Sequence, residues 1–318
     1  MYTGRPRLGA IKAVVENAKV FIFLERLGLS KPYLWLWRKK NSRALLNARR
    51  VKRFKQIENV INSSSDRDVI NRIAHELTEN GVAKAHISEF SNMPSLEEMK
   101  YSYEQLLIAE GASPHSRKGK SFIERLVDDD FSINSNGDPL STYLLNPGVA
   151  MACAKYLGLI PKLTSFKVWR SHQIELQERT ASQNWHRDYN EYQMVRVFCY
   201  FNDVTSDNGA GEYVKGSHFK GDSFDKLQDS EDGLSRYSTD NDINALFSLD
   251  RIAVAKGIAG TLFFLDTAGL HRGGFHPVPG ERRVSLTTFS TAADLQPTRI
   301  RKPKGLIHIS PLLDGVLV

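Results

Sequence analysis

Cysteine and long apolar runs are both scarce in this sequence of 318 residues. The two cysteines, Cys153 and Cys199, lie far apart, which excludes a disulfide framework or a zinc site built on paired CxxC motifs. We expect both thiols to be buried and reduced. No apolar run reaches the length of about 18 residues that a transmembrane helix needs. The sequence also starts without the features of a signal peptide, so we expect a cytoplasmic protein.

Acidic residues are scarce in the first part of the chain. Residues 1–56 contain fifteen Lys or Arg but only Glu16 and Glu25, a net charge of +13, whereas the whole chain carries +7 and the remainder therefore −6. A basic extension on a mildly acidic body indicates a separate docking element. Because no RNA- or DNA-binding motif accompanies it, we expect no nucleic-acid partner.

Aromatic residues accompany the basic ones in this extension, in Val20-Phe21-Ile22-Phe23-Leu24 and Tyr33-Leu34-Trp35-Leu36-Trp37. We expect residues 1–60 to form a helical extension. The pattern favours packing against the body or against a second subunit, which would make a homodimer. It leaves open a peripheral association with the inner face of a membrane through residues 1–56.

The pattern of apolar residues changes from helical to strand-like along the remaining chain. A helix is expected from about residue 66 to Asn80-Gly81, and others over about 95–109 and 147–157. From residue 163, short segments rich in β-branched and aromatic residues alternate with turns, at 163–170, 172–178, 194–202, 211–215, 260–265 and 282–290. We therefore predict a mainly β protein with flanking helices (α+β), a sandwich or small barrel rather than a parallel α/β sheet. The long, charged stretch 219–258 is a candidate lid.

Three side chains have the chemistry of a metal site. In Trp185-His186-Arg187-Asp188, an extended backbone places residues 186 and 188 on one side, so an imidazole and a carboxylate converge. A third ligand is offered by His271, in a glycine-rich turn after the apolar segment 260–265. Two histidines and one carboxylate on one face of a six-coordinate metal form the facial triad of non-heme iron(II) oxygenases.

An arginine pair follows the third ligand. Arg282 and Arg283 open the segment 282–290, and neighbouring strand residues face opposite ways, so one of the two enters the barrel. A guanidinium buried there needs an anionic partner, and a dicarboxylate such as 2-oxoglutarate would supply it.

These motifs resemble, in order and spacing, the phytanoyl-CoA dioxygenase-like family. The resemblance covers about residues 66–290 and rests on Trp185-His186-x-Asp188, Phe201-Asn202-Asp203-Val204 with Asn208-Gly209, Gly216-Ser217-His218, Gly260-Thr261-Leu262-Phe263-Phe264, His271 and Arg282. It implies a double-stranded β-helix (jelly-roll or cupin-like) core that uses Fe(II), 2-oxoglutarate as co-substrate and O₂. The family's arginine for 2-oxoglutarate stands eleven residues after the distal histidine, which selects Arg282 and leaves Arg283 as the alternative.

The resemblance also implies domain limits and a reaction. Residues 61–292 would form the oxygenase domain and 293–318 a C-terminal tail. The expected reaction hydroxylates an unactivated C–H bond of a small-molecule or lipid-linked substrate and releases succinate and CO₂. Asp188 argues for hydroxylation, or another oxidation such as desaturation, because related halogenases carry a small residue there. The alternatives are a catalytically silent barrel that binds a ligand, and an oxygenase that modifies a protein.

Substrate-binding residues are predicted from their place beside the metal motif and from their charge. Trp185, Tyr189 and Tyr192 would line the substrate mouth, or else pack in the core or rim. Arg170 and Arg196 would bind an anionic substrate, or else be exposed strand charges.

Overall fold

The computed structural model describes residues 43–109, 122–128, 131–133, 137–173, 178–188, 191–226, 237–294, 300–301, 312 and 316–317. Its helices are α3 (Arg43–Asn62), α4 (Arg67–Asn80), α5 (Leu96–Ala109), α6 (Pro139–Leu144), α7 (Pro147–Leu157) and α8 (Asp240–Leu246). Its strands are β1 (Val82–His86), β2 (Ile123–Asp128), β3 (Lys162–His172), β4 (Met194–Tyr200), β5 (Glu212–Val214), β6 (Ile252–Val254), β7 (Thr261–Asp266), β8 (His271–Arg272) and β9 (Glu281–Ser290).

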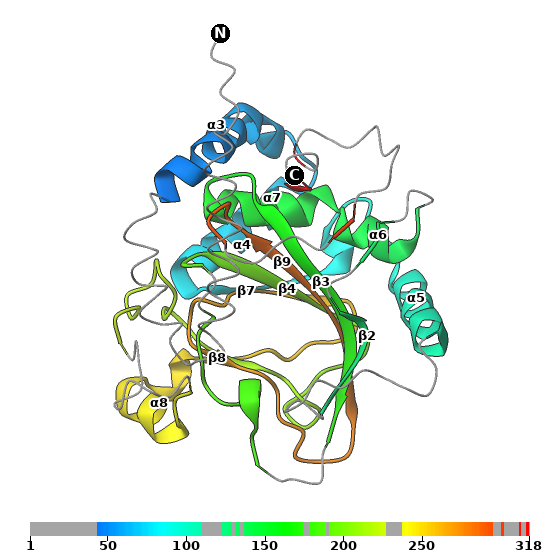
Figure 1. The fold of residues 1–318 in the computed structure, drawn as a ribbon, viewed down its shortest axis with the longest axis vertical. Coiled ribbons are helices and arrows are strands. Elements are labelled where there is room, and N and C mark those ends of the chain that lie inside the picture. The colour runs from blue at the N-terminus through cyan, green and yellow to red at the C-terminus, as the bar shows by residue number, and fades with distance from the viewer. Residues whose placement is uncertain are drawn as a thin grey trace.

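The strands form two antiparallel sheets (Figure 1). The large sheet has the order β1-β7-β4-β9-β3-β2 and the small one β6-β5-β8. An isolated bridge between His186 and His271 adds the segment before β4 to the small sheet. From β3 onward the chain therefore passes back and forth between the two sheets. This winding is a double-stranded β-helix, which confirms the predicted fold class.

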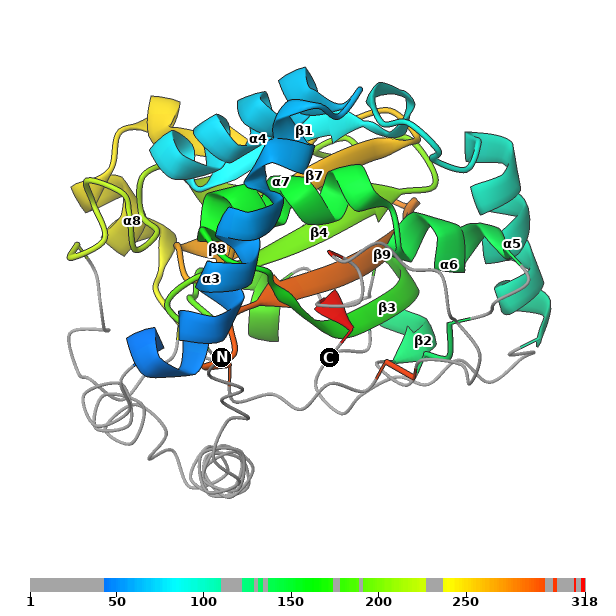
Figure 2. The ribbon, with the colours of Figure 1, turned by 90° about the horizontal axis from the view of Figure 1, so that it is seen from above.

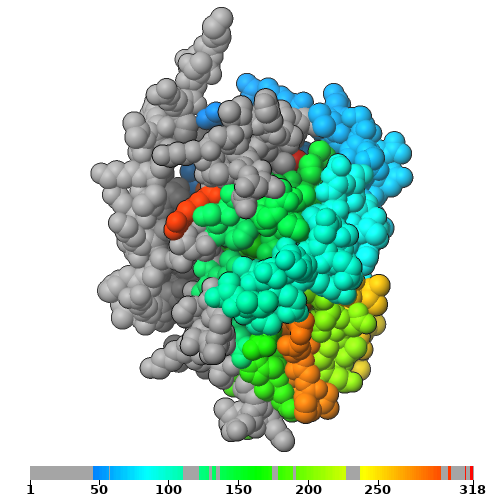
Figure 3. Space-filling view, turned by 90° about the vertical axis from the view of Figure 1, so that its right-hand side faces the viewer, coloured from blue at the N-terminus to red at the C-terminus, as the bar shows by residue number. Residues whose placement is uncertain are grey.

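Helices cover the outer face of the large sheet. Apolar residues at helical spacing on α4 pack with α7, which is apolar on nearly all sides, and with residues on the outer face of β3, β4, β7 and β9 (Figure 2). From the side, the chain from α4 to α5 forms much of the surface, with the orange segment that leads into β9 beneath it (Figure 3). The face of the large sheet that turns toward the small sheet carries a second apolar cluster, which includes Trp169, Tyr200 and Val284.

The basic extension lies partly outside the described residues. Its last part, from residue 43, belongs to α3, which runs through the expected boundary at residue 60. Phe54 of α3 is buried, Arg50 donates to the carbonyls of Ile160 and Pro161, and the Asn47 side chain accepts from the Ala292 amide. This part of the extension is packed on the body. In the described part of the chain, no helix is both long and apolar enough to cross a membrane.

The structure also describes parts of the expected lid, 219–258, and of the expected C-terminal tail, 293–318. The stretch 219–258 contains β6, so its end belongs to the barrel, while residues 227–236 lie outside the described residues. In the tail, Leu312 and Val316 are buried, and Arg301 bridges to Ser132. The expected strand 172–178 is not seen as such, because β3 ends at His172 and 174–177 are not described.

Candidate metal centre

The two histidines of the predicted triad face each other across an antiparallel bridge. His186 and His271 exchange backbone hydrogen bonds of 2.9 Å in both directions, and their ring centroids are 4.3 Å apart. Residues paired in this way carry their side chains on the same face of a sheet. The bridge therefore brings together two imidazoles that are far apart in the sequence.

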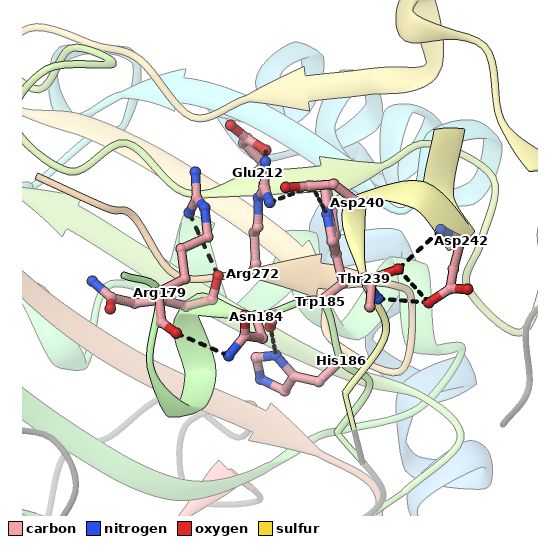
Figure 4. Close-up of polar contacts among 10 residues, drawn as sticks. Arg179, Asn184, Trp185, His186, Glu212, Thr239, Asp240, Asp242 and Arg272 are labelled. Atoms are coloured by element: carbon pink, nitrogen blue, oxygen red, sulfur yellow. Dashed lines mark hydrogen bonds and ion pairs between the residues drawn. The ribbon is translucent and has the colours of Figure 1, made fainter. Parts of the chain in front are cut away.

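Both imidazole rings are held in the tautomer that a metal requires. The Nδ1 of His186 lies 2.8 Å from the Asn184 carbonyl, and the Nδ1 of His271 lies 2.9 Å from the Gly269 carbonyl (Figure 4 shows the first). A carbonyl oxygen only accepts, so each Nδ1 carries the proton and donates it. Each Nε2 is then left with a lone pair, the arrangement in which a neutral histidine ligates a metal.

Asp188 completes the group. Ligand atoms of Asp188, His186 and His271 all lie within 4.8 Å of one another, and all three residues are buried. The Asp188 amide donates to the Thr267 carbonyl at 2.8 Å, which ties this residue to the end of β7. From β4, the Arg196 guanidinium approaches the same carboxylate, with Nη1 2.8 Å from Oδ2.

The electrostatics keep Asp188 and His271 in the forms that bind a cation. Burial alone would raise the pKa of Asp188, but the charge of Arg196, followed by the two histidines, holds that pKa well below its usual range. Burial lowers the pKa of His271 and outweighs the attraction of Asp188. A carboxylate and neutral imidazoles are the protonation states of a metal-binding set.

Arg187, between the two ligands of the motif, points away from them and fixes the surrounding loops. Its guanidinium donates to four backbone carbonyls, those of Ser217, Ala268, Phe224 and Lys226. It also lies over the Phe224 ring. The loops after β5 and β7 are therefore joined at one buried cation.

A second polar network lies beside His186 and includes Trp185, Arg272 and Asp240 (Figure 4). Arg272, next to His271, pairs with Glu212 and with Asp240 of α8, and stacks on Trp185 with 4.4 Å to the ring centroid. The Trp185 indole donates to Asp240 at 2.8 Å. The network joins the strand residues beside both histidines to α8.

The structure separates the two arginines of β9. Arg282 pairs in register with Ser171 and is buried, whereas Arg283 is about a third exposed and pairs with Glu104 and Glu281. Arg282 is thus the one that enters the barrel. Burial lowers its pKa, and in the described part of the chain it makes no ion pair with a carboxylate.

The surroundings of Arg282 explain the Asn-Gly motif. Its Nη1 donates to the Gly209 carbonyl at 2.6 Å, and it also interacts with the Tyr200 hydroxyl. Gly209 has φ +99°, and a Cβ there would lie 2.5 Å from Nε2 of His276. Only glycine fits this position. Burial, followed by the charge of Arg282, lowers the pKa of His276 to about 4, so this histidine is neutral.

The predicted substrate residues do not gather in one place. Trp185 is buried against α8, away from the ligand atoms, in the packing role left open by the sequence. Arg170 lies on the helix-covered face of β3 and pairs with Glu124 of β2. Tyr192 contacts the rings of Phe219 and Phe224, and Tyr189 lies outside the described residues.

Three further residues near the ligands escaped sequence reasoning. Arg187 and Arg272 flank the ligands in the sequence. Because arginine is usually exposed, the sequence did not indicate that these two side chains pack beside the site. Tyr237 contacts the His186 ring, with centroids 5.8 Å apart, through a bridge between Trp185 and Ser238 that only the fold creates. His218, the histidine of the Gly216-Ser217-His218 motif, donates from Nε2 to the Thr78 carbonyl of α4 and is not part of the triad.

Comparisons with known proteins give structural likenesses only. No family model and no curated protein matches the chain. Among solved structures, the non-heme alpha ketoglutarate dependent epimerase SnoN from nogalamycin biosynthesis is 15% identical with a TM-score of 0.49, over 70% of this chain and 84% of that one. The carbocyclase SnoK of the same biosynthesis gives 15% and 0.48, over 68% and 82%. EctD from S. alaskensis with bound Fe gives 13% and 0.47, over 72% and 79%.

Proposed function

We propose that this chain is an Fe(II)- and 2-oxoglutarate-dependent oxygenase. The observation that carries the proposal is the convergence of two imidazoles and one carboxylate, with both Nδ1 protons bound to carbonyls so that each Nε2 keeps its lone pair. These three ligands leave open positions on a six-coordinate metal.

The same donor set would also suit a catalytic zinc ion, so a second observation has to decide between the two. Arg282 is that observation, because it is a buried cation with no carboxylate partner in the described part of the chain. A zinc hydrolase has no need of such a group. A dicarboxylate co-substrate would neutralise it with one carboxylate and reach the metal with the other.

Fe(II), once held with 2-oxoglutarate, would supply the activation of O₂ and the oxidative decarboxylation that releases succinate and CO₂. The protein itself positions the metal and the co-substrate and excludes water from the site. His186, Asp188 and His271 hold one face of the metal, and Arg282 orients the co-substrate. Trp169 and Phe198, with rings 6.3 Å apart on the inner face of the large sheet, keep the interior apolar.

We further propose hydroxylation of an unactivated C–H bond of a small-molecule or lipid-linked substrate. Asp188 supports this choice, because its carboxylate occupies the position that a halide would need.

Calorimetry of Fe(II) binding and of 2-oxoglutarate binding under anaerobic conditions tests the proposal. We expect one Fe(II) site, lost in His186→Ala and His271→Ala, and 2-oxoglutarate binding that requires the metal. His218→Ala is the matched control, because His218 is buried close to the site but bonds to α4, and it should retain both ligands. Wild-type protein that binds Fe(II) but never 2-oxoglutarate would refute the proposal.

A further inference from the structure

We infer that the substrate of the proposed oxygenase carries an anionic group, a carboxylate or a phosphate, and that Arg196 binds it beside Asp188. The inference rests on the proposed function. It starts from the position of Arg196 on β4, where the side chain shares the inner face of the sheet with Tyr200, which interacts with Arg282.

Arg196 and Arg282 stand at opposite ends of the interior. Arg196 pairs in register with Thr288 of β9, six residues from Arg282. At the rise of a β-strand, this separation corresponds to about 20 Å between the two backbone positions. A five-carbon dicarboxylate anchored at Arg282 would extend toward the metal ligands from one side. Arg196 approaches Asp188 from the other side.

The charges of the loaded site leave Arg196 without a counter-ion of its own among the described residues. A divalent metal with Asp188, and a dianionic co-substrate with Arg282, cancel one another. Asp188 is the only carboxylate with which Arg196 makes an ion pair in the described residues, and its charge is then shared with the metal. The buried Glu191 accepts from the Thr291 hydroxyl and the Tyr192 amide instead.

Arg196 also has a hydrogen-bond donor that is not used in the structure. Its side chain is 22% exposed, and Nη1 is the atom that contacts Asp188. Nε is buried and makes no hydrogen bond in the structure. A guanidinium in an enclosed interior, with an unused donor and an uncompensated charge, is a recognition group for an oxyanion. The sequence offered Arg170 and Arg196 equally for this role, and only Arg196 lies on the inner face.

The test uses the full chain loaded with Mn(II) and 2-oxoglutarate, so that no turnover occurs. Mn(II)-dependent binding of 2-oxoglutarate is measured first, because its absence would mean that the proposed function itself fails. Thermal shifts are then recorded with matched series of aliphatic carboxylates, their amides and the corresponding alkyl phosphates, from four to eight carbons. We expect carboxylates or phosphates to raise the melting temperature and amides to have no effect, and the two acid series distinguish the two anions.

Dissociation constants of the best compound then assign the effect to Arg196. We expect Arg196→Gln to weaken binding about tenfold or more, as the loss of a charge-assisted hydrogen bond implies. Arg170→Gln, on the outer face of the sheet, should leave binding unchanged. Should Arg196→Gln not fold, Arg196→Lys, which keeps the charge, has to retain the preference for acids over amides.

Three results would overturn the inference while the proposed function stands. Amides would stabilise the loaded protein as much as acids do. No acid would stabilise it. The preference for acids would survive in Arg196→Gln.

Discussion

Asp266, at the end of β7, gives a sharp prediction about pH. The side chain is fully buried, with Oδ2 accepting from the Tyr156 hydroxyl at 2.5 Å and Oδ1 accepting from the Ala268 amide at 3.0 Å. Burial raises the pKa of Asp266 to about 7, against the lowering effect of these hydrogen bonds. The carboxyl group is thus protonated in the folded protein under mildly acidic conditions, where it is ionised in the unfolded chain.

The sign and size of the effect follow from this difference. Folding takes up a proton at Asp266 between the unfolded pKa of about 3.9 and the folded value, so its contribution to stability is complete below about pH 4 and is lost as the pH rises through 7. One proton changes the free energy of unfolding by up to about 1.4 kcal/mol per pH unit. Between about pH 5.5 and 8, Asp266 reduces the free energy of unfolding by about 2 kcal/mol, because the change per pH unit becomes smaller near the folded pKa.

Urea unfolding of the wild type and of Asp266→Asn across this pH range measures the effect. As the pH rises, the free energy of unfolding of the uncharged variant should increase by about 2 kcal/mol relative to that of the wild type. Buried histidines, which act in the opposite direction, cancel in the difference. The exposed Asp207→Asn is the matched control and should show a constant difference. A difference between wild type and Asp266→Asn that stays constant, or that grows in favour of the wild type, would refute a protonated Asp266.

Other buried contacts give further predictions. Arg187→Met leaves four backbone carbonyls, two of them buried, without their donor and should cost at least about 3 kcal/mol of unfolding free energy. Arg170→Met, on a partly exposed ion pair, should cost about 1 kcal/mol or less, and equal losses in chemical denaturation would contradict this. Gly269→Ala places a Cβ 2.0 Å from the Tyr213 hydroxyl and should weaken Fe(II) binding, with partial rescue by Tyr213→Phe, and failure of the rescue would show another cause. If the basic extension also binds anionic membranes, removal of residues 1–42 should abolish flotation with anionic liposomes and leave Fe(II) binding intact; flotation of both forms would contradict that role.

The sequence predicted the parts of the site that depend on local geometry. An extended His-x-Asp motif brings two side chains to one face in any strand, and strand alternation allows only one of Arg282 and Arg283 to point inward. The spacing after His271, which comes from the family resemblance, selected the buried arginine. The predicted helices over 95–109 and 147–157 agree closely with α5 and α7.

What the sequence could not supply depends on contacts between distant segments. The contact of Arg196 with Asp188 depends on the register of β4 with its neighbours. Trp185 does not line a substrate mouth, because α8 packs on it. The short helix α6, which begins with an Asp138 cap and Pro139, was not among the helices predicted from the sequence. The two-residue strand β8 is too short to carry a pattern of its own.

The most direct test of the account is succinate formation from 2-oxoglutarate by the purified protein with Fe(II) and ascorbate, without added substrate. We predict slow uncoupled turnover that is lost in His186→Ala. Arg282→Ala should bind 2-oxoglutarate about 10- to 100-fold more weakly, because a charge-assisted contact is removed. The adjacent Arg283→Ala, which loses only exposed ion pairs, should behave as the wild type. Turnover that survives in His186→Ala, or that depends on Arg283 and not on Arg282, would contradict the account.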